Sequence, residues 1–278
     1  MGKNSSMYFD IFKPHKALDI FIRYYWLLRV PSVSSQEVSQ QFLTEGVELS
    51  FNLGDPIEIA MENSIGKTVE SISISGPLTK PMKMRAKGRI EIFGVCFRPG
   101  GAYFFFPYPA HELTNCLADS QELWDAKGAS MVECFFNTCL TSKDRIEYLD
   151  RFFLHQLKKN NRKDDSISAA IRAIELHKGL ITIDYIAKTA GVSCRHLERK
   201  FKERVGLSPK QLCRNLRFKN ALSSKIRYPE GSWLETALDC GYYDQAHMIN
   251  DFKHFTGLSP SVYFKNPTTV DPFFTANF

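Results

Sequence analysis

Two kinds of hydrophobic pattern divide the chain near residue 110. From residue 41 to residue 97, short stretches alternate apolar and polar positions and stop at Gly, Pro or Asn turns, which is typical of β-strands. From residue 112 to 157, and again from 166 onwards, apolar residues recur every three or four positions, which predicts amphipathic helices. The pattern therefore predicts an α+β chain with a strand-rich N-terminal part.

The N-terminal pattern predicts strands over residues 47–51, 57–60, 69–74, 80–89 and 90–97, with a Ser-rich break at 31–39 and a turn at Gly88. Residues 8–30 fit a helix face as well as a buried strand, so both remain open. This strand spacing favours a small sandwich or barrel. Helices are expected at 112–117, 121–124, 129–140 and 143–157, and the apolar face of the last one suggests a homodimer contact.

One device of seventeen residues occurs twice, at 193–209 and at 244–260, with a constant offset of 51 residues and seven identical positions. Each copy predicts a helix that ends at glycine and a new helix that starts at Ser-Pro. Before the first copy, Thr182 can cap a short helix and Gly191 is placed to take a positive φ. A helix, a short glycine-containing turn and a second helix are the spacing of a helix-turn-helix.

The two devices are joined by a long helix expected at 209–227. At 1.5 Å per residue it spans roughly 28 Å, which is near the ~34 Å of one DNA turn. A spacer of this length can set two recognition helices into successive major grooves.

Positive charge is confined to the C-terminal part of the chain. The net charge is +6, whereas residues 1–165 carry equal numbers of acidic and basic groups and residues 166–265 carry 16 Lys and Arg against 9 Asp and Glu. This favours binding to a polyanion, although a solvated basic surface is the alternative. Residues 193–227 carry eleven Lys and Arg against two Glu, and residues 232–265 carry two Lys against four acidic groups. The first unit and the long helix are therefore expected to dominate affinity.

The helix after Ser193 keeps Leu197 and Phe201 on its core side and carries candidate DNA contacts on the opposite side. Arginine suits guanine and a carboxylate can accept a hydrogen bond from cytosine. The alternative is that the arginines only pair with Glu198 on a solvated face. The candidates in and near the first unit are Ser193, Arg195, Glu198, Arg199, Lys200, Lys210 and Arg214, and the long helix is expected to be strongly basic through Arg217, Lys219 and Lys225 as well.

The N-terminal part offers no catalytic signature. Residues 17–110 contain no His, which argues against a metal site of the cupin type, and no GxSxG, P-loop or GxGxxG motif occurs. We therefore expect no enzyme, no metal and no cofactor. Phe93, Phe97, Tyr103 and Phe105 are candidates for a ligand pocket, with ordinary core packing as the alternative. The chain has no apolar run of membrane-spanning length and no secretory signal, so a cytoplasmic location is expected.

Residues 166–265 resemble the AraC/XylS family of bacterial transcription regulators. The resemblance rests on the Ala-Gly of the first turn, the Gly of the second, the repeated Phe-Lys, both Gly-Leu-Ser-Pro closures and the run 241–257. It implies seven helices, with two recognition helices bound to promoter DNA. In the family, base contacts come from positions six, three and two before the helix Phe. These positions correspond to Arg195, Glu198 and Arg199 in the first copy, and to Ala246, Ile249 and Asn250, with Gln245 beside them, in the second.

The N-terminal part resembles the sensor domain of an uncharacterised branch of that family, through residues 51–55 (FNLGD) and 97–101 (FRPGG). This resemblance implies a cupin-like barrel with trailing helices and no particular ligand. The expected organisation is a sensor or dimerisation domain at 1–160, a linker at 161–165, a double helix-turn-helix domain at 166–265 and a tail at 266–278.

The sequence thus predicts a sequence-specific DNA-binding transcription regulator, either an activator or a repressor, controlled by a small-molecule effector or by dimerisation. RNA polymerase is a further candidate partner. Two alternatives remain: a cupin-like enzyme domain fused to a DNA-binding module, and a basic adaptor that binds other proteins.

Overall fold

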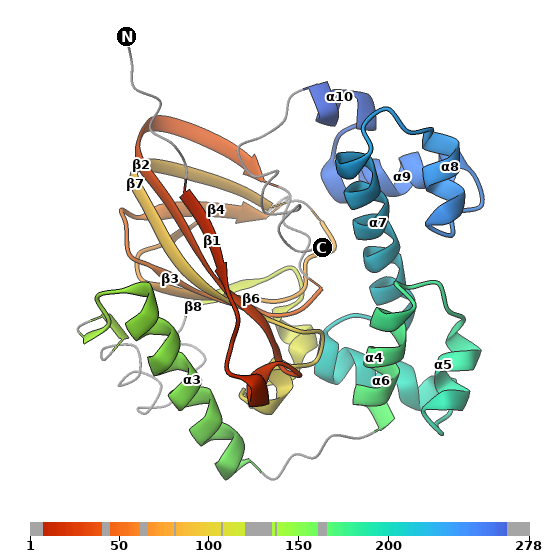
Figure 1. The fold of residues 1–278 in the computed structure, drawn as a ribbon, viewed down its shortest axis with the longest axis horizontal. Helices are drawn as coiled ribbons and strands as arrows, with labels where there is room; N and C mark the ends of the chain where they lie inside the picture. Colours follow the sequence, from red (N-terminus) through yellow and green to blue (C-terminus); the bar gives the residue numbers. More distant parts are fainter. Residues whose placement is uncertain are drawn as a thin grey trace.

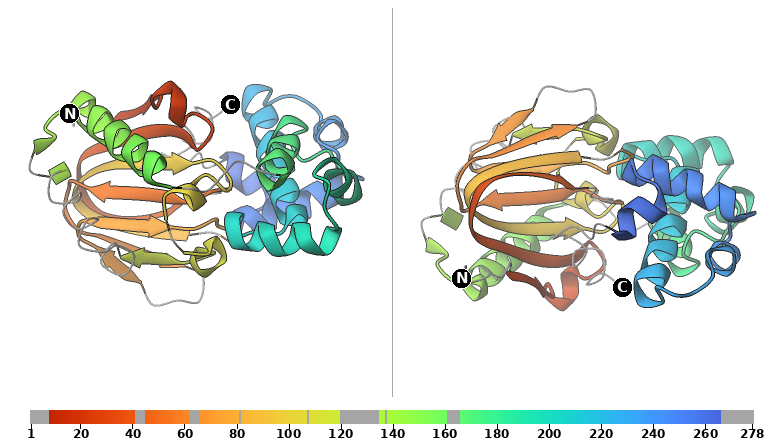
Figure 2. Two further views of the ribbon diagram at one scale, coloured as in Figure 1. Left: turned by 90° about the horizontal axis from the view of Figure 1, so that it is seen from below. Right: turned by 90° about the horizontal axis from the view of Figure 1, so that it is seen from above.

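The structure, a computed structural model, describes residues 8–40, 45–61, 66–80, 82–106, 108–119, 135–136, 138–160 and 166–265. Within these ranges, eight antiparallel strands form one half of the molecule and seven helices form the other (Figure 1). We call them the sheet half (8–160) and the helical half (166–265). The helical half stands beside the sheet rather than over its face (Figure 2). This is the α+β architecture that the sequence predicts.

The sheet is organised around two long strands that pair with each other, β2 (Ile22–Gln40) and β7 (Met82–Phe97). The C-terminal part of β7 also pairs with β3, whereas its N-terminal part pairs with β4, so the sheet forks along this strand. The other strands are β1 (Tyr8–Phe12), β3 (Glu48–Asn52), β4 (Ile57–Met61), β5 (Lys67–Val69), β6 (Ile72–Ser75) and β8 (Leu117–Asp119).

Residues 8–30, for which helix and strand were both open, form β1, the short 3₁₀ helix η1 (Lys16–Leu18) and the first part of β2. Both faces of β2 are buried: Tyr25 and Leu27 belong to one apolar cluster, and Trp26 belongs to another. A strand covered on both faces lacks the apolar–polar alternation of a half-exposed strand, so periodicity did not identify it. Gly94 lies opposite Trp26 on β7, and a Cβ there would come within 2.0 Å of the indole.

Four local expectations for the sheet half were wrong. The single strand expected at 69–74 is two strands, β5 and β6, which have different partners. The break at 31–39 is part of β2, which instead shows register shifts between Val30 and Gln36, where a proline cannot donate to the ladder. The turn at Gly88 is part of β7, where this residue has a φ of +94°. The helix expected at 112–117 is a 3₁₀ helix, η3 (Ala110–Leu113), followed by β8. The helix expected at 121–124 and most of that at 129–140 lie outside the described residues.

The helix expected at 143–157 is present as α3 (Ser142–Lys159), which begins with a capping box between Thr141 and Asp144. Its apolar face, including Leu149 and Phe153, is buried against the sheet (Figure 1). The prediction of a homodimer contact rested on this face. Because the face is covered within the chain, that argument loses its basis.

The helical half contains the expected seven helices within residues 166–265. They are α4 (Ser166–Leu176), α5 (Ile183–Thr189), α6 (Cys194–Val205), α7 (Pro209–Arg227), α8 (Trp233–Asp239), α9 (Gln245–Thr256) and α10 (Pro260–Lys265). The cap predicted at Thr182 is confirmed, because its side chain accepts a hydrogen bond from a backbone N–H of α5. The side chains of Ser193, Ser208 and Asp244 cap α6, α7 and α9 in the same way. The α6 and α9 helices both end at a left-handed glycine.

Candidate nucleic-acid interface

The first unit presents a polar face on α6. Leu197, Phe201 and Val205 are buried in the core beneath it, and Arg195, Glu198 and Arg199 are exposed. One guanidinium nitrogen of Arg199 lies 3.4 Å from Nδ1 of His196, and another lies 4.0 Å from Glu203, whereas Glu198 is not its ion-pair partner. The three expected base-contacting side chains therefore share one exposed face.

Two other candidates of this unit have local partners. The Ser193 hydroxyl accepts a hydrogen bond from the backbone N–H of His196 at 3.2 Å, so this residue acts as the helix cap. Lys200 is half-buried, and its ammonium lies 2.7 Å from Glu203. The hydrogen bond from Lys200 lowers the pKa of the Glu203 carboxyl. Because Glu203 compensates part of its charge, Lys200 is less available for a phosphate than its sequence position suggested.

The second unit presents a neutral face on α9. Ala246 and Asn250 are exposed, and Gln245 and Ile249 are half-buried. Met248, Phe252 and Phe255 lie on the opposite, buried side of the helix. The two copies therefore share a scaffold and differ in the side chains that they present to solvent.

The long helix α7 is less basic on its surface than the sequence predicted. Lys219 and Lys225 are 9% and 2% exposed, so neither contributes to a strongly basic surface. Lys219 pairs with Glu45 at 3.3 Å, and Lys225 donates hydrogen bonds to the carbonyl oxygens of Pro229 and Gly231. The helical spacing indicates the burial of Lys219, because this residue lies three positions from both Leu216 and Leu222 on the inward side of the helix.

Arg214 also serves the fold. A guanidinium nitrogen lies 2.7 Å from the buried carboxylate of Asp251, and the group lies 5.1 Å from the ring centre of Phe255. These contacts attach α9 to α7. Lys210, by contrast, is exposed near the start of α7 and is available for a phosphate.

The predicted aromatic ligand pocket does not form as a unit. Phe93 and Phe97 are fully buried in the core beneath α3. Phe105 packs on Phe153, and the ring of Tyr103 lies 4.6 Å from the guanidinium of Arg204. Four cavities in the described part of the structure are lined by other residues.

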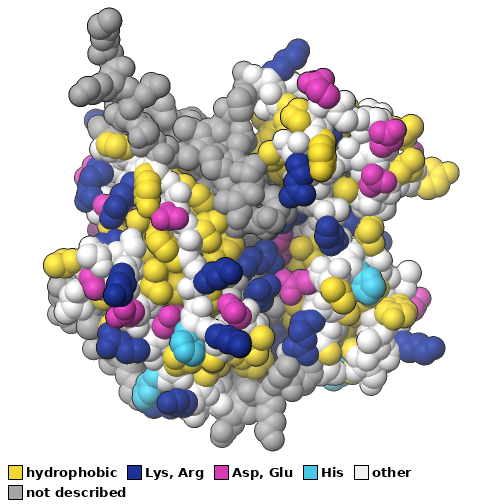
Figure 3. Space-filling view, in the orientation of Figure 1, with side chains coloured by type: hydrophobic (Ala, Val, Ile, Leu, Met, Phe, Trp, Pro, Cys, Tyr) yellow, Lys and Arg dark blue, Asp and Glu magenta, His cyan; other side chains and the backbone are white. Residues whose placement is uncertain are grey.

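Sequence reasoning missed the seam, the contact zone between the sheet half and the helical half. The Thr114 hydroxyl donates a hydrogen bond to the carbonyl oxygen of Gly206 at 2.8 Å, which attaches the end of α6 to the sheet half. Arg23 of β2 pairs with Glu175 of α4 at 3.1 Å. Lys and Arg side chains lie on both sides of the seam (Figure 3). These contacts join residues about 90 and 150 positions apart, so no local pattern signals them.

No cluster of three or more His, Cys, Asp or Glu side chains able to hold a metal occurs among the described residues. In the same ranges, every helix is too short or too polar to cross a bilayer.

Two families match the chain. Residues 10–119 match a domain of unknown function (DUF6597), and residues 186–266 match a helix-turn-helix domain. An uncharacterised HTH-type transcriptional regulator of Haemophilus influenzae is 26% identical over 168 residues, which cover 57% of this chain and 53% of that protein. The HTH-type transcriptional regulator MtrA of Neisseria gonorrhoeae is 34% identical over 83 residues, 30% of this chain and 27% of that protein. The chain thus matches about half the length of the first relative and about a quarter of the second.

Among solved structures, ToxT from Vibrio cholerae has a TM-score of 0.50 at 12% identity, and the match covers 94% of this chain and 98% of that one. This likeness concerns the fold alone. Fold and exposed helix faces together define a double helix-turn-helix protein with an N-terminal sheet. Residues 186–266 are a helix-turn-helix domain, and this part of the chain resembles the AraC/XylS-type transcription regulators.

Proposed function

We propose that the protein is a sequence-specific DNA-binding transcription regulator whose N-terminal region, residues 1–160, controls the DNA-binding region, residues 166–265. The observation that carries this proposal is the exposed face of α6, where Arg195, Glu198 and Arg199 stand opposite a buried apolar side. A helix with this arrangement fits a major groove, where arginine reads guanine and a carboxylate reads cytosine. No metal or catalytic group is part of the proposal, and the matched relatives are described as regulators rather than enzymes.

The two units contribute unequally in this proposal. The α6 helix offers cationic base contacts and Lys210 offers a phosphate contact, whereas the exposed face of α9 is neutral around Asn250. Phosphate neutralisation supplies much of the affinity of DNA-binding proteins, so the first unit should contribute more of the affinity for DNA than the second. Asn250 and Gln245 suit adenine, which has both a donor and an acceptor in the major groove.

The test compares Arg199→Ala with Asn250→Ala. Binding sites are first selected from a random duplex pool with the full chain, and one selected duplex is then titrated at fixed salt by fluorescence anisotropy. Arg199→Ala should weaken binding by about 1–3 kcal/mol, and Asn250→Ala by less. Lys143→Ala, which removes an exposed charge on α3, is the control and should leave affinity unchanged.

Two outcomes would count against the proposal. A loss of DNA affinity in Asn250→Ala that equals or exceeds the loss in Arg199→Ala would contradict the unequal contribution of the two units. Failure of the pool to yield any enriched sequence, together with no salt-dependent affinity for duplex DNA, would contradict DNA binding itself and favour a protein-binding adaptor.

A further inference from the structure

The long helix α7 packs into the cores of both helix-turn-helix units. Near its start, Leu212 belongs to the apolar cluster that contains Phe201 of α6. Further along, Phe218 belongs to the cluster that contains Phe252 of α9. The position of one recognition helix relative to the other therefore depends on how each of them packs against α7 (Figure 1).

Arg214 lies on α7 between the residues that enter these two clusters, and it makes an ion pair with Asp251 of α9. Its Nε and a terminal guanidinium nitrogen lie 2.8 Å and 2.7 Å from the same carboxylate oxygen. The Asp251 side chain is 3% exposed, so the carboxylate is shielded from solvent. Charge-assisted hydrogen bonds have a defined direction, and Arg214 therefore holds α9 at one place on α7.

A second contact between α7 and the second unit lies beside this ion pair. Tyr242 belongs to the turn before α9, and its hydroxyl is buried. Burial raises the pKa of this hydroxyl, and the nearby carboxylate of Asp251 raises it further. The guanidinium of Arg217, one turn along α7 from Arg214, lies 5.9 Å from the centre of the Tyr242 ring. Two arginines of α7 thus contact polar side chains of the second unit.

Aromatic rings also join α7 to α9. The ring of Phe218 lies 5.3 Å from that of Phe252 and 4.9 Å from that of Phe255, centre to centre. Burial of these rings stabilises the packing, but the hydrophobic effect is non-directional and does not select one position of α9 along α7. A buried ion pair adds little net stability over apolar side chains of similar size, and its best-attested role is to select one register. The ion pair is therefore suited to positioning α9.

We propose that Arg214 and Asp251 are positioning residues that fix the place of α9 relative to α6, so that the protein selects the spacing between the two halves of its DNA site. Asn250, the exposed residue next to Asp251, then reaches a base only at one distance from the bases that Arg199 contacts. One extra base pair between the half-sites moves the second half-site by about 3.4 Å along the duplex and turns it by roughly 35°. A fixed α9 follows this change only by losing the ion pair or by deforming the DNA, an inference that rests on the proposed DNA binding by α6 and α9.

The test uses the duplex that the full chain selects from a random pool. The two half-sites are assigned by repeating the selection with Arg199→Ala and with Asn250→Ala, each of which should relax one part of the selected sequence. Duplexes with one base pair added or removed between the half-sites are then titrated by fluorescence anisotropy at fixed salt. The unmodified chain should bind them about tenfold more weakly than the selected duplex, which is the effect of one lost base contact.

The double variant Arg214→Leu/Asp251→Leu replaces the ion pair with apolar side chains. Such replacements of buried ion pairs are often neutral or stabilising, so urea denaturation should show a folded protein of undiminished stability. Its preference for the selected spacing should fall to about threefold or less, because the aromatic rings alone allow α9 to shift. If the double variant does not fold, Arg214→Gln, which removes the charge and keeps hydrogen-bonding groups, replaces it and should reduce the preference in the same direction.

Phe218→Leu is the matched control, because it weakens the aromatic packing of α7 on α9 and leaves the ion pair in place. It should lower the stability in urea and retain the preference for the selected spacing. Arg227→Leu removes an exposed arginine from the end of α7 and should also retain that preference, whatever its effect on overall affinity. A merely structural role of the ion pair predicts instead that the spacing preference follows stability.

The inference is overturned if the variant without the ion pair keeps the spacing preference of the unmodified chain, or if Phe218→Leu loses that preference to the same extent. Equal binding of the unmodified chain to all spacings also overturns it. Failure of the proposed function has a different signature, since the unmodified chain would then enrich no duplex from the pool.

Discussion

The ammonium of Lys219 lies 3.3 Å from the carboxylate of Glu45, and this contact joins the long helix α7 to the sheet half. Arg23 reaches the same carboxylate at 3.1 Å and also pairs with Glu175 of α4. Burial by itself raises the pKa of Glu45, but Lys219 and Arg23 more than offset this effect and leave the pKa below its ordinary value. A charged carboxylate therefore lies between two cations in the seam.

Glu45→Gln should destabilise the protein, because the buried groups of Lys219 and Arg23 would both lose the carboxylate that they share. The expected loss is about 3 kcal/mol in the free energy of unfolding, measured by urea denaturation at pH 7. Since the pKa of Glu45 is lowered by folding, its stabilisation is present above the ordinary glutamate pKa and is lost as the pH falls through the lowered value. The difference between the two proteins should therefore shrink in acid.

The control is Glu58→Gln, which removes one partner of the exposed pair with Arg85 at 4.0 Å. An exposed pair of this kind contributes about 0–1 kcal/mol. Equal losses for Glu45→Gln and Glu58→Gln would show that the cluster at Glu45 is no more important than a surface pair.

Glu48→Gln should stabilise the protein at high pH, whereas Glu45→Gln should destabilise it. Glu48 lines the small cavity inside the sheet, and burial raises the pKa of its carboxyl from 4.5 to about 7. The folded protein then holds this proton up to about pH 7 while the unfolded chain releases it near pH 4.5, so the contribution to stability falls as the pH rises through that window. Glu48→Gln should raise the melting temperature at pH 8 and change it little at pH 4.5. A lower melting temperature at pH 8 would contradict the raised pKa.

Gly206→Ala and Gly191→Ala separate backbone conformation from crowding. Both glycines have positive φ, +83° and +67°, so alanine at either site should cost roughly 1–2 kcal/mol for the left-handed conformation. A Cβ at Gly206 would also lie 2.8 Å from the carbonyl oxygen of Ala110, whereas nothing lies within 4 Å at Gly191. Gly206→Ala should therefore be the more destabilising of the two in urea denaturation. Equal losses of stability for the two variants would mean that the end of α6 shifts enough to accommodate the Cβ without weakening its contact with the sheet half.

Lys210→Ala and Arg214→Ala should separate DNA contact from packing on the same helix. Lys210→Ala should reduce the slope of log affinity against log salt by about 1 and leave unfolding unchanged. Arg214→Ala should instead lower stability, because the Asp251 carboxylate would remain buried without its partner. The measurements are a salt series of DNA titrations and urea denaturation. Loss of stability in Lys210→Ala, or an unchanged stability in Arg214→Ala, would contradict this division of roles.

The helical half was predictable because its signals are local. Ser193, Ser208 and Asp244 cap their helices through backbone groups within three residues. Gly206 ends α6 through its left-handed backbone conformation, which is also a local property. The caps and the 3.6-residue periodicity set the helix boundaries, and the second copy of the device repeated them. The sequence also determined which side of α6 is apolar, since Leu197 and Phe201 are one turn apart.

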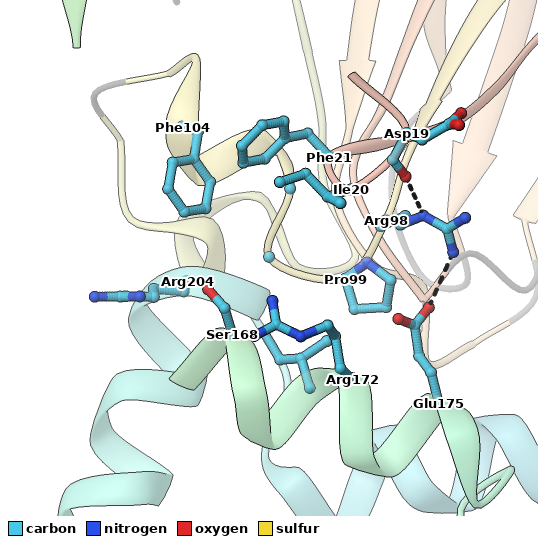
Figure 4. A pocket seen from close by; sticks show the side chains of 13 residues that line it. Asp19, Ile20, Phe21, Arg98, Pro99, Phe104, Ser168, Arg172, Glu175 and Arg204 are labelled. Carbon is cyan, nitrogen blue, oxygen red and sulfur yellow. Dashed lines mark hydrogen bonds and ion pairs between the residues drawn. The ribbon is translucent and has the colours of Figure 1, made fainter. Parts of the chain in front are cut away.

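The roles of individual charges were decided only by the tertiary structure. Lys219 and Arg214 lie on a basic helix, yet one pairs with Glu45 across the seam and the other with Asp251 on α9. Neither partner lies within one turn, so helix spacing does not identify it. The cavity between the sheet half and α4 has the same origin, because Phe21 and Arg172 line it from the two halves of the molecule (Figure 4). Local chemistry thus determined the elements and their exposed faces, and contacts between distant residues determined which charges are paired inside the fold and which stay exposed.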